Sequence, residues 1–489
     1  MASVSANTLE VNGDVPIQKV AVYPTYLDQG KINAVNENDG TWAWRIIGDS
    51  FALPNFTTDG VVEVDWGDGT VETLTTAEHT FTNASPHTVR FRLTSGTYFQ
   101  PRINNNATYK DMVVAVGSAP EGMIVDILNI YRGCSNLKSF DGTLSAINAA
   151  TESWRDCTSL TSFPFIDTSA VTSFANTWYG CSSLTSFPLI DTSSGTIFNL
   201  AWLNCSSLTS FPLIDTSSGT NFSQSWISCS SLTSFPLIDT SSGETVTNTW
   251  QNCTSLTSFP QLDLSSATNA QSAWESCTSL TSFPAIDMSI CTNFQETWKS
   301  CTSMTEFGLV DTSSGENFSE AWYNCSSLTS FPLIDTSSGT NFFQTWRLCS
   351  SLTSFSLIDT SAGTSFDRTW TNCSSLTSFP SIDTSLSTTF FAAWLNCISL
   401  TDFPANFFDS WTGTPANNCF LQAWDNCPSL TPTSVVNILT SLDTSGQSAP
   451  ASGVDITIDY AGGDISAAST AITNLKSRGW TVTINGVAQ

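Results

Sequence analysis

A tryptophan recurs every 24 residues along the middle of this 489-residue chain, and this period constrains the fold more than any other feature. A cysteine follows each of these tryptophans by three residues, and Tyr131/Cys134 and Trp424/Cys427 extend the series by one unit at either end. Such a fixed period is typical of stacked repeats. The sequence therefore predicts a solenoid of thirteen coils from about Tyr131 to about Leu430. The unbroken series is Trp154, Trp178, Trp202, Trp226, Trp250, Trp274, Trp298, Trp322, Trp346, Trp370 and Trp394.

Within one unit the apolar residues are separated by steps of four, three, three, three and three, which favours a helical turn leading into a tight arc that faces inward. The stretch Leu-Thr-Ser-Phe is predicted to be a short strand, stacked about 4.8 Å from its neighbours in a parallel sheet. The following Pro lacks an N–H and would end this pairing. The stretch Asp-Thr-Ser-Ser-Gly is typical of a turn, and its Gly is able to take a positive φ. One unit is exemplified by Phe198, Trp202, Cys205, Leu208, Phe211 and Ile214.

The Trp, Cys and Leu positions are predicted to form three buried columns, because their spacing places them on one inward face. Exposed Trp residues could instead form a platform for stacking glycans. The Cys column could hold metal or disulfides, but parallel side chains in a stack have poor geometry for S–S bonds, so buried free thiols are expected. Cys291 and Cys419 lie off the column and could pair or stay reduced. Representative column residues are Trp178, Trp202, Trp226, Cys181, Cys205, Cys229, Leu184, Leu208 and Leu232.

The spacing of Trp202, Cys205 and Leu208 resembles the BspA-type leucine-rich repeat, in which an aromatic residue, a Cys and a Leu recur in the same way. The resemblance covers about 300 residues of this chain. It implies a curved α/β solenoid used in adhesion and ligand contact, without catalysis. This chain has Trp where the family usually has Phe, so the core side chain is larger.

Two segments precede the solenoid, which is assigned to residues 118–430. Residues 1–39 show no period and are interpreted as an N-terminal arm. Residues 40–117 alternate as strands around a Gly-rich turn at Asp65-Trp66-Gly67-Asp68-Gly69, which predicts a β-sandwich. This motif resembles a PKD-type domain, a resemblance that implies a non-catalytic spacer.

Residues 431–489 break the repeat and are predicted to be a C-terminal α/β cap, since an open solenoid end would expose apolar surface and strand edges. Helices are expected at Ser434–Leu439 and Ala467–Leu475, and strands at Val454–Ile458 and Trp480–Ile484. The predicted fold class is thus an α/β repeat solenoid resembling leucine-rich repeats, with an N-terminal β-sandwich and this cap.

The charge of the chain excludes several partners. Its 42 acidic and 15 basic residues give a net charge of −27, which repels nucleic acid and anionic lipid. No apolar stretch reaches the length of a membrane span, and the N-terminus lacks the pattern of a secretory signal. We therefore expect no nucleic-acid partner and no membrane insertion.

No catalytic or cofactor-binding residues can be assigned. The chain has only His79 and His87, and the usual hydrolase, nucleotide and dinucleotide motifs are missing, so an enzyme is not expected. The Asp column from Asp167 to Asp383 is interpreted as a series of Asx turns, with a row of Ca²⁺ sites as the alternative. Asp65 and Asp68 carry the same two interpretations.

The residue after each Trp varies from coil to coil, so it follows no evident packing rule and is the first candidate for a contact surface. Neutral drift on a solvated face is the alternative. The candidate contact residues are Arg155, Tyr179, Gln251, Glu275, Lys299, Tyr323 and Arg347.

Three functions compete. The first hypothesis is a non-enzymatic virion protein of a tailed bacteriophage, acting as a tail fibre, host-recognition or capsid-decoration component. Its N-terminal region would contact other virion proteins, and its solenoid would contact a host glycan or protein. It would be made in the host cytoplasm. The alternatives are a bacterial cell-surface adhesin with leucine-rich repeats and, least favoured, a polysaccharide-degrading enzyme. The architecture alone suggests the virion hypothesis.

Overall fold

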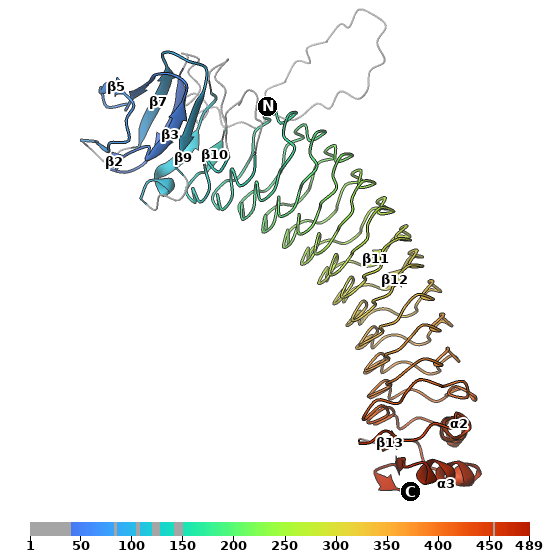
Figure 1. The fold of residues 1–489 in the computed structure, drawn as a ribbon. Coiled ribbons are helices and arrows are strands. Elements are labelled where there is room, and N and C mark those ends of the chain that lie inside the picture. Colours follow the sequence, from blue (N-terminus) through green and yellow to red (C-terminus); the bar gives the residue numbers. More distant parts are fainter. Residues whose placement is uncertain (1–40, 83–85, 104–107, 120–127, 141–149, 453–454) are drawn as a thin grey trace, which may run out of the picture.

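A computed structural model shows a curved stack of coils with a β-rich domain at its N-terminal end and a helical segment at its C-terminal end (Figure 1). The structure describes residues 41–82, 86–103, 108–119, 128–140, 150–452 and 455–489. The predicted N-terminal arm, residues 1–39, lies outside these ranges.

The N-terminal domain contains a six-stranded sheet in the order β10-β9-β1-β7-β4-β5. Strands β4 and β7 alternate buried and less buried residues, as expected for strands with one face in a core. The β3–β8 pair packs on this core, where the Phe99 ring contacts Trp42 and Phe91. The domain is therefore β-rich, as expected, while its likeness to a PKD domain stays a prediction. The strands are β1 (Trp42–Ile46), β2 (Ser50–Phe51), β3 (Asn55–Thr58), β4 (Val62–Asp65), β5 (Val71–Thr73), β6 (His79–Thr80), β7 (His87–Leu93), β8 (Phe99–Arg102), β9 (Val113–Val116) and β10 (Ser139–Phe140), with a 3₁₀ turn at Lys110–Met112.

The sheet of this domain continues into the first coil of the solenoid. Strand β10 belongs to the predicted solenoid, yet it pairs in parallel with β9. Trp44 of β1 also contacts Tyr131 of the first coil, with ring centroids 5.7 Å apart. One core therefore runs across the predicted boundary between residues 117 and 118, and the β-domain covers the N-terminal end of the stack.

The segment around each Trp is not the helical turn that the spacing predicted. In the third coil, the N–H groups of Phe174, Asn176, Trp178 and Gly180 donate to carbonyls of the next coil at 2.7–3.1 Å. The alternate residues instead bond three residues back, within the coil. Asn176 and Gly180 have φ values of 55° and 73°, a left-handed conformation that interrupts any helix. The apolar steps of three and four arise from successive tight turns.

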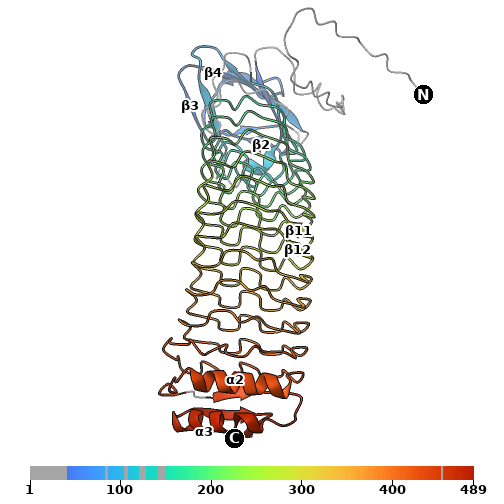
Figure 2. The same cartoon turned by 90° about the vertical axis from the view of Figure 1, so that its right-hand side faces the viewer.

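The predicted strand at Leu-Thr-Ser-Phe is extended but forms little sheet. Most coils make a single contact of the type Thr209 N–H to Thr185 O at 3.3 Å. Among the described residues of the repeat, only β11 (Ser282–Phe283) and β12 (Glu306–Phe307) pair as strands (Figure 2). The Leu and the Phe, three residues apart, both point inward, which a flat strand with its period of two cannot achieve.

Aromatic columns fill the solenoid core. From Trp154 to Trp424, successive indole rings stack with centroids 5.1–6.0 Å apart and interplanar angles of 1–12°. The Phe of each Leu-Thr-Ser-Phe stretch meets these rings edge-on, as Phe211 meets Trp202 at 4.8 Å. The named Trp, Cys and Leu residues of the three predicted columns are fully buried. The core prediction is confirmed.

The Cys column consists of free thiols. From Cys181 to Cys427, each thiol of the column donates to the carbonyl of the Trp in the preceding coil, as Cys205 does to Trp178 at 3.2 Å. All fifteen cysteines are buried and unpaired, including Cys291 and Cys419. Burial raises the pKa of Cys253 to about 12, so this thiol stays protonated and hydrogen-bonded at neutral pH.

The glycines of the Asp-Thr-Ser-Ser-Gly turn do not adopt the positive φ that their residue type permits. Gly219 is needed for space, because a Cβ there would lie 2.5 Å from the ring of Phe222. Ala270 replaces this Phe in one coil, and the two neighbouring Gly positions hold Ala267 in the same coil and Cys291 in the following coil. Cys291 therefore fills space that a smaller neighbour leaves.

The C-terminal segment has the predicted helices and strands at nearly the predicted residues, and it covers the last coil. Thr431 caps the first helix by accepting a hydrogen bond from the Ser434 N–H. Ser434 accepts from the Phe403 N–H, and Trp424 forms a parallel bridge with Ile458. The elements are α2 (Pro432–Thr444), β13 (Asp455–Ile458), a 3₁₀ turn at Ser466–Ala468, α3 (Ser469–Ser477), β14 (Thr481–Ile484) and β15 (Val487–Ala488).

Truncating one stacked indole should destabilise the solenoid strongly. Trp226→Ala leaves a large cavity and should lower the free energy of unfolding by about 3–5 kcal/mol. Trp226→Phe should cost less, because it keeps a ring and removes an indole N–H that has no acceptor among the described residues. Urea unfolding followed by circular dichroism measures both changes. Equal losses in the two variants would contradict this packing.

Adding one methyl group at Gly219 should also destabilise the chain. Gly219→Ala forces a Cβ against Phe222 and should cost about 1–3 kcal/mol, as overpacking does in cores. Phe222→Leu in the same chain should recover part of this loss, because it removes the clash. If the two substitutions are strictly additive in urea unfolding, the Gly serves another purpose.

Candidate binding groove on the solenoid

The backbone conformation determines which residue types occupy one row along the solenoid. The residue two places after each Trp is left-handed, with φ values of 58–61° at Asp156, Asn204, Ser228 and Asn252 and 73° at Gly180. This conformation favours Gly, Asn and Asp, whose short side chains tolerate it. We call these five residues the left-handed row.

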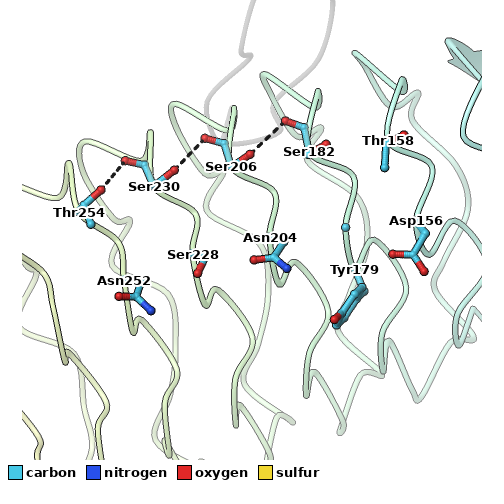
Figure 3. Close-up of a pocket in the computed structure, with 11 residues that line it drawn as sticks. Asp156, Thr158, Tyr179, Ser182, Asn204, Ser206, Ser228, Ser230, Asn252 and Thr254 are labelled. Atoms are coloured by element: carbon cyan, nitrogen blue, oxygen red, sulfur yellow. Dashed lines mark hydrogen bonds between the residues drawn. The ribbon is translucent and has the colours of Figure 1, made fainter.

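A second polar row runs beside the first and consists of Thr158, Ser182, Ser206, Ser230 and Thr254, here called the hydroxyl row. Three of these hydroxyls donate to the carbonyl of the preceding member, each at 3.4 Å (Figure 3). These bonds are long for hydroxyl donors. The hydroxyl oxygens consequently keep acceptor capacity, and they can exchange these weak contacts for stronger ones with a ligand.

The two rows line an open groove of about 690 Å³ that extends over five coils. Tyr179 completes the lining, and the Arg155 guanidinium lies over its ring at 4.5 Å from the centroid. Asp156 is the one charged side chain in the lining. The other polar groups are hydroxyls and amides, which can both donate and accept hydrogen bonds.

The variable residue after each Trp is half-buried in most coils, and several of these side chains contact one another across coils. Gln251 donates to Glu275 at 2.7 Å. Tyr323 has the Lys299 ammonium 5.5 Å and the Arg347 guanidinium 5.7 Å from its ring centroid. The expectation that no packing rule operates here is therefore wrong for these coils, since neighbouring side chains pair by charge and ring contact.

Lys299 is the most strongly paired member of this variable row. Its ammonium contacts Glu296 at 2.8 Å and Glu320 at 2.7 Å. Burial alone would lower the pKa of Lys299, but the bonds to both carboxylates outweigh it and raise the pKa. Arg155 and Tyr179 lie at one end of the groove, whereas Lys299, Tyr323 and Arg347 are not part of its lining.

The Asp column forms the expected Asx turns. The Asp191 carboxylate accepts from the Ser193 N–H at 3.0 Å and from its hydroxyl at 2.7 Å. The hydroxyl and then the N–H of Ser241 lower the pKa of Asp239 in the same way. Asp65 and Asp68 likewise accept from backbone N–H groups of their turn. Among the described residues no three His, Cys, Asp or Glu side chains group as metal ligands, and Ca²⁺ binding stays a prediction.

Sequence reasoning missed the left-handed row and the groove. The signal was present, because the position two after Trp holds Asn, Ser, Asp or Gly in nearly every coil. The neighbouring position is more conspicuous in the sequence, because its residue type varies from coil to coil.

No protein-family model matches the chain, and no curated protein is similar to it at a significant level. A leucine-rich repeat protein from Bacteroides ovatus is similar in structure, with 17% identity, coverage of 79% of this chain and 81% of its own, and a TM-score of 0.32. A leucine rich cell surface protein from Faecalibacterium prausnitzii has 14% identity, coverage of 71% and 94%, and a TM-score of 0.33. Within the described ranges, no helix combines the length and apolar character needed to cross a bilayer.

Proposed function

We propose that this chain is a non-enzymatic adhesive protein whose solenoid binds neutral glycans in the groove between the left-handed row and the hydroxyl row. The observation that carries the proposal is the lining itself: amides and hydroxyls repeated coil after coil, with Tyr179 at one end and Asp156 as the single charge. Such groups match the donors and acceptors of sugar hydroxyls.

The regular coil spacing and the charge of the chain narrow the ligand class. The groove repeats similar donors over five coils, which suits a chain of similar sugar units better than a compact metabolite. A net charge of −27 disfavours sulfated or sialylated glycans through long-range repulsion. A neutral oligosaccharide has no such cost.

Adhesion through this groove could serve on a bacterial cell surface or on a phage particle. The bacterial cell-surface alternative agrees in wording with the description of one structural neighbour, and neither neighbour is described as a virion protein. A tail-fibre, host-recognition or capsid-decoration role in a phage therefore stays a prediction. Anchoring through residues 1–39 also stays a prediction, because that segment lies outside the described residues.

Removing two groove hydroxyls should weaken glycan binding. A panel of immobilised neutral and anionic oligosaccharides identifies the best ligand, and calorimetry gives its Kd. In the variant Ser206→Ala/Ser230→Ala the Kd should rise at least about tenfold, because each neutral hydrogen bond contributes ~1 kcal/mol. The backbone of the left-handed row is untouched by these changes.

The matched control is Ser350→Ala/Ser374→Ala, which removes the same type of hydroxyl, with the same 3.4 Å contacts, from coils outside the groove. Its Kd should equal that of the parent chain. Equal weakening in both variants, preferential binding of anionic glycans, or a panel with no bound neutral glycan would each overturn the proposal.

A further inference from the structure

A row of exposed large apolar side chains runs along the solenoid outside the groove. Its members share one repeat position, directly after the Pro or its substitute, and most are more than 60% exposed. Single exposed apolar residues are ordinary on proteins, but runs over four and then three consecutive coils are not. We call this set the leucine row: Phe165, Leu189, Leu213, Leu237, Leu309, Leu333 and Leu357.

The fold does not require these residues. The next residue in each coil, such as Ile190, is buried and fills the core, so the leucine before it points outward. Gln261 and Ser381 occupy the same position in other coils, where they are also exposed. A polar residue therefore serves the coil equally well, and the recurring apolar choice needs another explanation.

The Asp column lies alongside the leucine row. Leu189 and Asp191 are both exposed and are separated by the inward-pointing Ile190, so they lie on the same outer face. The ten carboxylates from Asp167 to Asp383 occupy this position in ten consecutive coils. Any partner that covers the leucine row must also meet this line of negative charge.

From this juxtaposition we propose that the leucine row is a docking surface for a basic amphipathic α-helix of a partner protein, with the helix axis along the solenoid. Its apolar ridge covers Leu189, Leu213 and Leu237, and its Lys and Arg side chains face the adjacent Asp column.

The coil spacing supports a helix. The Phe rings beneath this part of the row are 5.7–6.1 Å apart. One helical turn advances about 5.4 Å, so one turn matches one coil closely. The four residues from Phe165 to Leu237 then need about twelve helical residues, at roughly 1.5 Å each.

Charge decides between this partner and two others. A second copy of the chain brings the same Asp column and a net charge of −27, so the two copies repel each other. An anionic lipid surface is repelled for the same reason. The leucine row shares no residue with the groove lining, so this inference stands independently of glycan binding.

The test uses the full chain and a synthetic 18-residue helical peptide with one leucine ridge flanked by Lys and Arg. Fluorescence anisotropy should show saturable binding that weakens as salt rises. In Leu189→Ser/Leu213→Ser/Leu237→Ser the Kd should rise at least about tenfold. In Asp191→Asn/Asp215→Asn/Asp239→Asn, where the amide oxygen can still accept the turn hydrogen bonds, the Kd should rise and its salt dependence should fall.

The matched control is Ile290→Ser/Leu386→Ser, which removes exposed apolar side chains away from the row and should leave the Kd unchanged. Thermal melting by circular dichroism verifies that each variant is folded. Equal binding by the triple Ser variant, or by a peptide of the same composition with two central prolines, would overturn the proposal. Row-dependent self-association in sedimentation, or row-dependent binding to vesicles of anionic lipid, would overturn it in favour of a second copy or a membrane.

Discussion

The backbone hydrogen bonds between neighbouring coils are the constraint on which this structure depends. A coil of this repeat has almost no helix and almost no sheet of its own, so its buried N–H and C=O groups must find partners on the coils before and after it. The donors around each Trp reach forward to the next coil, and the Cys thiol reaches back to a Trp carbonyl. Both directions require that successive coils be in register.

The sequence was sufficient to predict the period and the buried columns, because stacking repeats identical side chains at one inward position. It was misleading on local conformation, since apolar steps of three and four fit a helix and a chain of tight turns equally well. The left-handed residues Asn176 and Gly180 decide between them. The role of Gly219 was also missed. It depends on the rings of Phe222 and Phe198, which are close to Gly219 in sequence and in space, but the pattern does not say where these rings lie.

The same register that builds the core also aligns the outer positions into rows. The left-handed backbone conformation favours small polar residues in the left-handed row. The adjacent hydroxyl row lines the same groove. The leucine row is not selected by the fold, which is why it suggests a partner, whereas the Trp row is fully explained by packing. The candidate surfaces were thus hard to predict from the sequence. The buried Trp position and the exposed leucine position are both apolar and both repeat, and only their burial in the structure distinguishes them.

The central claim is that columns in register, spaced by 24 residues, carry the fold, and shortening the repeat tests it most directly. Deleting residues 199–222 removes one whole unit and lets Trp178 stack on Trp226. Deleting residues 199–220 removes two residues fewer and places the following columns out of register with the preceding ones. The account predicts that the first variant melts cooperatively close to the parent temperature, while the second melts far lower or fails to fold. Equal melting of the two variants by circular dichroism would contradict it.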